Sequence, residues 1–309
     1  MTVRLFSHHK VNAQMSGQQG FTLIELAMVL FIVGLVLIST LVPLTTQMEV
    51  RSIADTHRVM DQINEALVGF TQANGRLPCP ASPLLQTGLD ATAGTEQYTA
   101  PSCTVQVGVI PWATLGVPET DAWGRRFTYR VAPVFSDAIA QNTWNTTTPA
   151  TQTAWLDCTT PTPTPTQSSF ALCSLGAIAV LDRAITPITG VHTTSTVGSG
   201  LAAVFLSHGK NGYGAFQPNG VQVTGLIVNS DEATNALAAN GTAGGGVLGN
   251  APSGNTFQSY LFYSRTRTPA STGCSETVTN ALFCEYDDIV YMISTPTLVS
   301  RMISAGRLP

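Results

Sequence analysis

The longest apolar run in the chain extends from Phe21 to Leu44 and contains a single charged residue, Glu25. A helix of this length spans ~36 Å, whereas the hydrocarbon core of a bilayer is ~30 Å thick. The run therefore predicts a transmembrane helix over residues 21–45. Because an acid inside a membrane helix is costly, Glu25 is a candidate functional residue.

The hydrophobic pattern becomes amphipathic in the next segment, residues 46–78. Apolar residues recur there every three or four positions with charged residues mostly between them, which predicts a second helical half that continues into a globular head. These apolar residues are Val50, Ile53, Met60, Ile63, Leu67 and Phe70. Asn74-Gly75 is a typical helix end, and Pro78 prevents continuation. Pro43, between the two halves, favours a kink.

Beyond Cys79, short β-branched runs alternate with breaks rich in Gly, Pro, Asn and Ser, which is typical of strands. The runs are residues 105–112, 127–135, 176–181, 201–207, 221–228, 257–263 and 289–294. Together with the long helix they predict an α+β fold, in which this helix packs on a mainly antiparallel sheet in a head formed by residues 79–309. The Thr/Pro-rich segment 142–168 and the Gly-rich segment 240–255 are expected to be exposed loops.

The pattern also predicts a short helix near the C-terminus. Thr295 is the candidate N-cap, Pro296 fits the first turn, and Gly306 follows the last turn. One face of this helix is apolar, so it should pack on the head; its residues are Leu298, Val299, Met302 and Ile303.

Composition and charge narrow the function classes. The chain has 309 residues, 14 Lys and Arg, 18 Asp and Glu, and a net charge of −4. The cations are few and dispersed, so no nucleic-acid partner is expected. Arg4 and Lys10 lie in the polar segment 1–20, and positive charge favours the cytoplasmic side for that end. No small-x-small cleavage site follows the apolar run, as a secretory signal would require.

All six cysteines lie beyond the apolar run, at Cys79, Cys103, Cys158, Cys173, Cys274 and Cys284. An even number in an oxidising compartment favours disulfides. Fifteen pairings are open. Pairing between sequence neighbours is the simplest because it closes short loops. A metal site is the alternative, but no C-x-x-C pair is present.

The segment from Gly20 to Glu25, Gly-Phe-Thr-Leu-Ile-Glu, followed by the apolar run, resembles the type IV prepilin signature of pilins, minor pilins and pseudopilins. The resemblance implies cleavage after Gly20 by a membrane-embedded prepilin peptidase, so that residues 1–20 are a leader peptide. It also implies N-methylation of the Phe21 amine, and neutralisation of an N-terminal amine by Glu25 when subunits pack in a filament. A helix break at Pro43 is a further expectation from this family.

Three segments of the head resemble pseudopilin heads more weakly. They are Asp121-Ala-Trp-Gly124, Ser207–Gly212 and Glu285–Val290. In the first, the aspartate can close a turn, the tryptophan can fill core volume, and the glycine permits positive φ. In major pseudopilins, loops in the last region bind calcium, which suggests Asp287, Asp288 and Glu285 as oxygen ligands. The alternative is a solvated acidic turn.

These observations predict a structural subunit of a type IV pilus or a type II secretion pseudopilus, as a minor pilin or pseudopilin. The resemblance implies three kinds of partner: the prepilin peptidase, other subunits and an inner-membrane assembly platform. It places the chain in the bacterial inner membrane with its head in the periplasm, and afterwards in the filament. A membrane-tethered adhesin or binding protein at a filament tip is the alternative. A tethered hydrolase is disfavoured because no G-x-S-x-G, H-E-x-x-H or P-loop pattern appears, so no enzymatic activity and no cofactor besides calcium is expected.

Overall fold

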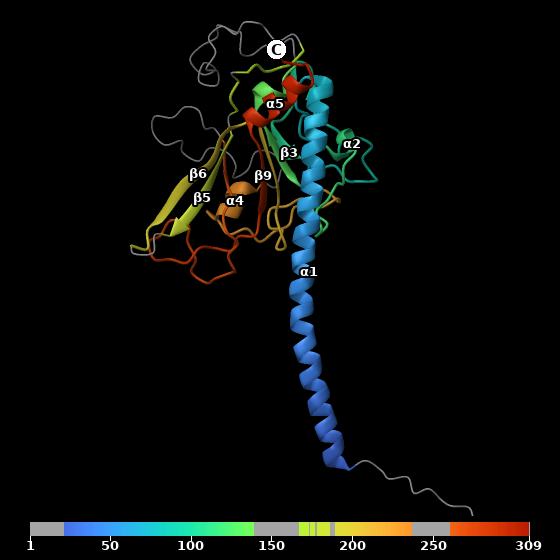
Figure 1. Cartoon of the computed structure of the whole chain (residues 1–309), viewed down its shortest axis with the longest axis vertical. Coiled ribbons are helices and arrows are strands. Elements are labelled where there is room, and N and C mark those ends of the chain that lie inside the picture. Colours follow the sequence, from blue (N-terminus) through green and yellow to red (C-terminus); the bar gives the residue numbers. More distant parts are fainter. Residues whose placement is uncertain are drawn as a thin grey trace, which may run out of the picture. The chain divides into compact units, whose positions relative to one another are not determined.

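The computed structural model describes residues 22–138, 167–172, 174–176, 178–185, 189–236 and 260–308, without the side chains of residues 38–46. The chain forms two compact units, residues 1–50 and 51–309. Helix α1 (Leu23–Asn74) starts in the first unit and ends in the second (Figure 1). It runs through Pro43 as one helix, and the expected kink at this residue stays a prediction. No helix in the described part of the chain meets the requirements of length and apolar character for a membrane span.

In the second unit, one face of α1 is buried. Its fully buried residues follow a helical spacing and are Thr56, Met60, Ile63, Leu67 and Thr71. Met60, Ile63 and Leu67 belong to the predicted stripe, whereas Val50 is exposed and Phe70 is only half-buried. The buried Thr71 hydroxyl donates to the Leu67 carbonyl (2.7 Å), which satisfies it within the helix. The helix ends at Asn74 and Gly75 has φ 72°, so the predicted end is confirmed.

The buried face of α1 contacts a four-stranded antiparallel sheet. Its order is β3 (Val107–Val109), β4 (Thr128–Val131), β7 (Ala203–Ser207) and β9 (Ile289–Ile293). Ile63 and Leu67 share one buried cluster with Tyr129 and Phe205. The described fold is therefore α+β, with an N-terminal helix and mainly antiparallel sheets.

A second sheet has three strands in the order β6 (His192–Leu201), β5 (Ile178–Ile185) and β8 (Tyr260–Tyr263). Strand β5 is antiparallel to β6 but parallel to β8. A separate two-stranded hairpin joins β1 (Tyr98–Thr99) to β2 (Ser102–Cys103). Strand β6 was not predicted, because its Thr- and Ser-rich sequence has no apolar alternation.

Six of the seven predicted runs overlap β3, β4, β5, β7, β8 and β9 in turn, although β5 extends past its run to Ile185; the run 221–228 forms no strand. Only an isolated bridge, between Phe216 and Gln222, forms at its start. Backbone hydrogen bonds join residues 221–223 to residues 214–217, but Val221 and Val228 are exposed and Gly225 has φ 127°, so the pairing does not extend along the run. The loops predicted at 142–168 and 240–255 lie almost entirely outside the described residues.

The C-terminal helix α5 (Thr295–Ser304) is confirmed, with two corrections. Its N-cap is Ser294, whose side chain accepts from the Thr297 amide, and not Thr295, whose hydroxyl donates to the Gly200 carbonyl (2.6 Å). Three of the four apolar residues are buried, whereas Ile303 is 45% exposed. At its end Gly306 has φ 70°.

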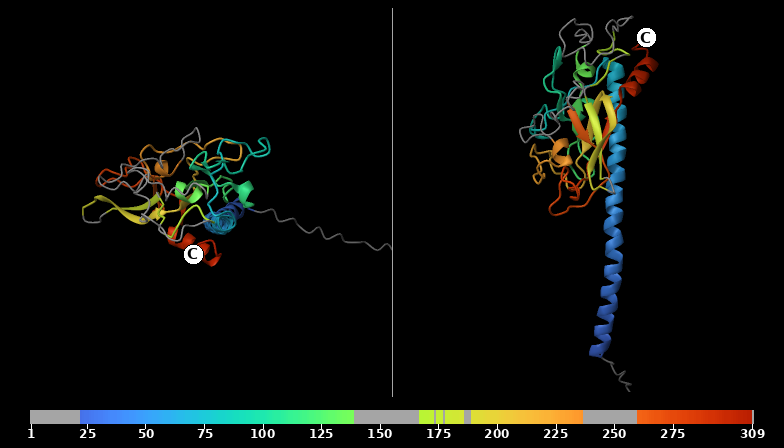
Figure 2. Two further views of the ribbon diagram at one scale, coloured as in Figure 1. Left: turned by 90° about the horizontal axis from the view of Figure 1, so that it is seen from above. Right: turned by 90° about the vertical axis from the view of Figure 1, so that its left-hand side faces the viewer.

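Helix α5 lies alongside the C-terminal end of α1 (Figure 2). The Gln72 side chain donates to the Arg301 carbonyl (3.1 Å), and Arg307 donates to the Ala73 carbonyl (2.7 Å). The short helices α2 (Trp112–Leu115), α3 (Pro133–Ser136) and α4 (Asp231–Asn235) join strands and loops of the head.

Several irregular segments of the head meet at one fully buried arginine, Arg126. Its guanidinium donates to the carbonyls of Pro83 (2.8 Å) and Pro218 (3.0 Å) and to the Glu119 carboxylate (2.8 Å). It also stacks on Trp112, with 4.5 Å between the guanidinium carbon and the ring centroid. One side chain thus holds three loops in place.

Candidate functional site

Gly20 and Phe21 lie outside the described residues, but the residues directly after them form a defined helix start. The Thr22 amide and hydroxyl both donate to Oε2 of Glu25 (2.9 and 2.8 Å), and the Glu25 amide donates to the Thr22 hydroxyl (3.3 Å). This is a capping box, and its Thr-x-x-Glu spacing was a signal that sequence reasoning overlooked. Glu25 is thus fixed in the first turn of α1, where the helix dipole favours an anion.

In the head, three buried carboxylates form what we call the carboxylate cluster: Glu232, Asp287 and Asp288. Each contributes an oxygen, and these oxygens lie within 4.8 Å of one another. Glu232 is in the first turn of α4, whose N-cap Ser230 accepts from the Ala233 amide (3.1 Å). Asp287 and Asp288 directly precede β9.

Backbone and amide donors hold the carboxylate cluster in place. Oδ2 of Asp287 accepts from the amides of Lys210 and Asn211 (2.8 and 2.9 Å). The amide of Asp287 donates to Glu232 (2.8 Å), and the Asn235 side chain donates to Oδ2 of Asp288 (2.8 Å). The Oδ1 atoms of Asp287 and Asp288 are buried and have no hydrogen-bond partner.

A buried histidine, His208, points at the cluster. Its Nδ1 lies 3.4 Å from Oδ1 of Asp288 and has no hydrogen-bond partner, while its Nε2 lies 2.9 Å from the Thr128 hydroxyl. The order Thr128, His208, Asp288 has the residue types of a nucleophile, base and acid. However, His208 is inaccessible and Thr128 is 1% exposed, so this hydroxyl cannot contact a substrate.

The carboxylate cluster is short of positive charge. Burial raises the pKa of Glu232 to about 9, and the charges of Asp288 and Asp287 add to the rise. Burial also raises the pKa of Asp287. The guanidinium of Arg267 lies 3.8 Å from the Asp287 carboxylate, but this arginine is exposed. Protons or a bound cation must therefore balance the negative charge of the cluster. Its carboxylate oxygens are ligands of the kind that a hard divalent cation prefers.

The structure brings together two of the three acids named from sequence. Asp287 and Asp288 are in the cluster, whereas Glu285 is not and is half-buried. Glu232, which sequence reasoning missed, takes the third position. In the sequence, Ser230 followed by two acids predicts the start of a helix that contains Glu232. The sequence does not show that tertiary contacts bring this helix next to residues 287–288.

Comparison with protein families matches residues 15–41 to the prokaryotic N-terminal methylation motif. The chain carries a type IV pilin-like signature. This match supports a pilin- or pseudopilin-type precursor, and the family of this motif is structural rather than enzymatic. The motif implies processing by a prepilin peptidase and assembly with pilin-type subunits, and it suggests a membrane-associated precursor. Comparison with curated proteins and with solved structures gave no match.

Outside the pilin-like signature, the Asp121 turn has a folding role. One carboxylate oxygen of Asp121 accepts from the amides of Trp123 and Arg125 (2.9 and 3.0 Å), and Gly124 has φ 77°, as predicted. The other oxygen accepts from the Ser207 hydroxyl (2.6 Å). Trp123 is only half-buried, so the expectation that it fills the core is wrong.

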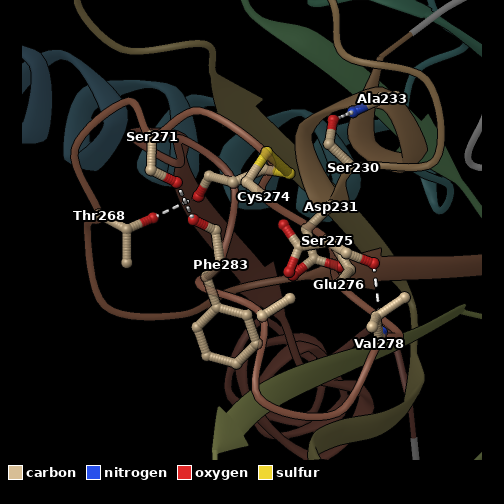
Figure 3. Close-up of a disulfide and its surroundings, with 12 residues drawn as sticks. Ser230, Asp231, Ala233, Thr268, Ser271, Cys274, Ser275, Glu276, Val278 and Phe283 are labelled. Atoms are coloured by element: carbon tan, nitrogen blue, oxygen red, sulfur yellow. Dashed lines mark hydrogen bonds between the residues drawn. A yellow bond between two sulfur atoms is a disulfide. The ribbon is translucent and has the colours of Figure 1, made fainter.

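Two of the three disulfides between sequence neighbours are present, Cys79–Cys103 and Cys274–Cys284. Cys158 and Cys173 lie outside the described residues, so their pairing stays a prediction. The loops closed by the two described bridges predict a stabilisation of about 3 kcal/mol each. Figure 3 shows the second bridge next to Asp231 and Glu276.

Asp231 and Glu276 belong to a buried set of charges that we call the arginine network, with Arg183 and Arg265. Arg265 donates to Asp231 (2.8 Å) and Glu276 (2.9 Å), and Arg183 lies 3.0 Å from Asp231. Burial and the Asp231 charge raise the pKa of Glu276, while the two arginines oppose this rise. The network fastens the disulfide loop to α4 and β5.

Proposed function

We propose that the protein is a structural subunit, a minor pilin or pseudopilin, of a type IV pilus or type II secretion pseudopilus. The methylation motif at residues 15–41 carries this proposal. The precursor is cleaved after Gly20, and the Phe21 amine is then methylated. Residues 21–45 anchor the subunit in the inner membrane, its head lies in the periplasm, and an assembly platform moves the subunit into the filament. The α+β head with its helix packed on a sheet is compatible with a pilin-like fold.

In this proposal, Glu25 neutralises the Phe21 amine of a neighbouring subunit. An unpaired carboxylate in an apolar filament core is costly, and an adjacent ammonium group removes most of that cost. Thr22 donates both of its hydrogen bonds to Oε2 of Glu25, so Oε1 remains available to the Phe21 amine of the neighbouring subunit. The capping box thus orients the acid before assembly.

Replacement of Glu25 tests the pairing. Glu25→Leu should insert in the membrane and be cleaved normally, yet co-purify with filaments at a small fraction of the wild-type level. Thr22→Val is the matched control, because it keeps the charge of Glu25 and the bond from the residue 22 amide and removes only the hydroxyl. It should enter filaments at a much higher level than Glu25→Leu. Normal incorporation of Glu25→Leu would refute the pairing.

Cleavage is tested separately. A bulky residue, Gly20→Trp, should leave residues 1–20 on the protein, as read by mass spectrometry of the intact product. Loss of the apolar run itself from the wild-type product would contradict the proposed anchor.

We also propose that the carboxylate cluster binds calcium. Asp287, Asp288 and Glu232 would hold the ion, and the unpartnered Oδ1 atoms of the two aspartates support this assignment. Since calcium would bind the folded head only, an excess of one hundred times the Kd should stabilise it by about 2.7 kcal/mol.

The calcium test compares melting temperatures in calcium and in chelator. The wild type should melt higher in calcium, Asp288→Asn should lose this difference, and Glu285→Gln, outside the cluster, should keep it. Equal melting of the wild type in both buffers would overturn the calcium site without touching the filament proposal.

A further inference from the structure

Strand β6 has one open edge. It pairs with β5 along one side, and no strand in the described part of the chain pairs with its other side (Figure 1). Residues 193–197 are all exposed, and the register with β5 is regular from Leu181 to Ile185. An open, regular strand of this length offers unpaired backbone groups to another chain.

Two other sheet edges, those of β8 and β3, are closed by hydrogen bonds. At β8, the Asn235 side chain donates to the Tyr263 carbonyl (2.9 Å) and accepts from the Tyr263 amide (2.8 Å), as a neighbouring strand would. At β3, Ala81 exchanges two backbone hydrogen bonds with Val109 (2.9 and 3.0 Å). The open edge of β6 therefore differs from the edges that the same head closes.

The sequence of β6 lacks the usual protection against strand pairing. From Thr193 to Leu201 it has no charge and no proline, and its exposed part is Thr-Thr-Ser-Thr-Val. Edge strands that must stay unpaired commonly carry lysine, proline or a bulge. The two register shifts between β6 and β5 begin at Val197, so residues 193–196 carry none of these protections. Its β-branched residues instead favour further pairing.

We propose that β6 pairs in antiparallel register with β6 of a second copy, centred on Ser195. This register places Thr194 opposite Thr196 and Thr193 opposite Val197, so that every pair is uncharged and contains a hydroxyl group. Cross-strand threonine pairs stabilise sheets, and no like charges meet. The contact is isologous, so it joins two copies into one six-stranded sheet and then closes.

Cysteine cross-linking in the full-length protein tests the register. Ser195→Cys should form a disulfide-linked dimer on non-reducing gels, because residues directly opposite have Cα atoms about 5 Å apart. Thr193→Cys alone should not, since its two copies would lie ~13 Å apart, but a mixture of Thr193→Cys and Val197→Cys should. Cross-linking of Ser195→Cys no greater than that of Thr224→Cys, in an exposed loop, would overturn the proposal.

Charge variants separate strand pairing from association through α1. In the Thr193→Cys and Val197→Cys mixture, Ser195→Lys in both partners should reduce the disulfide yield at least tenfold. Ser195→Lys in one partner and Ser195→Glu in the other should restore it. Equal yields in both combinations would also overturn the proposal. None of these readouts depends on filament assembly.

Discussion

Two neighbouring residues of α4, Asp231 and Glu232, meet opposite electrostatic surroundings. Both are almost fully buried. Asp231 lies between Arg183 and Arg265, at 3.0 and 2.8 Å. Glu232 faces two further carboxylates, and its pKa rises to about 9. The role of a buried acid therefore cannot be inferred from its burial. It depends on whether positively or negatively charged groups surround the acid.

This difference assigns different roles to the two groups of charges. In the arginine network each carboxylate has a guanidinium partner, so the network can stabilise the fold without any ligand. In the carboxylate cluster, burial and the neighbouring acids raise the pKa of Glu232 and of Asp287, and in the proposed calcium site a bound ion would supply the positive charge. The same short helix serves both.

The largest effect should come from removing a counter-charge in the arginine network. Arg265→Met leaves Asp231 and Glu276 short of positive charge in a buried place, and we expect a loss of about 3–5 kcal/mol in urea unfolding. Arg267→Met, at the half-exposed arginine beside the cluster, is the control. If both variants lost the same unfolding free energy, the proposed difference between the arginine network and the carboxylate cluster would be wrong.

The pH dependence should be the next largest effect. Because the folded pKa of Glu232 lies near 9 and its ordinary value is 4.5, the folded state keeps a proton that the unfolded state releases. In metal-free protein the contribution of Glu232 to stability should be full below pH 4.5 and fall as the pH rises toward 9, by about 1 kcal/mol per unit.

Glu232→Gln should flatten this slope, as measured by urea unfolding between pH 5 and 8 in chelator. Calcium should stabilise the wild type more at pH 8 than at pH 5, because it competes with the proton. A slope that is the same in Glu232→Gln would assign the pH dependence to other groups.

A smaller effect should follow from Gly209→Ala. Gly209 has φ 57°, and a Cβ there would overlap the backbone carbonyl oxygen of Asp287. We expect a loss of about 2–3 kcal/mol and weaker calcium binding, because the loop must move away from the carboxylate cluster. Gly273→Ala, at a similar φ of 69° with open space around it, should cost only about 1 kcal/mol.

The smallest effect should come from an exposed ion pair. Arg301 lies 3.5 Å from Glu65, and both side chains are more than half exposed. Arg301→Ala should therefore change the unfolding free energy by at most about 0.5 kcal/mol. A loss comparable to that of Arg265→Met would mean that burial does not determine the strength of these pairs.

Local sequence predicted those features that local chemistry determines. Gly75 and Gly306 mark helix ends, and the pairing of Cys274 with Cys284, sequence neighbours that close a short loop, was the simplest of the fifteen pairings left open. Asp287 and Asp288 were predicted as possible calcium ligands from the resemblance of their segment to pseudopilin loops.

Features that depend on distant contacts were missed. Strand β6 is held by β5, and no apolar pattern of its own indicates a strand. The run 221–228 has the composition of a strand, but only its first three residues pair with a neighbour, the segment 214–217. Glu232 and His208 reach the carboxylate cluster only because α4 and the end of β7 pack against residues 287–288. Thr295 could have capped α5, but its hydroxyl instead bonds to Gly200.

Arg126 shows that loops without regular secondary structure can still be ordered cooperatively. Its single guanidinium satisfies carbonyls near Pro83 and Pro218, which lie far apart in the chain. Neither segment can reach its native conformation unless this cation is already enclosed, and the cation cannot leave water until both segments surround it. These loops should therefore become ordered in a single concerted step.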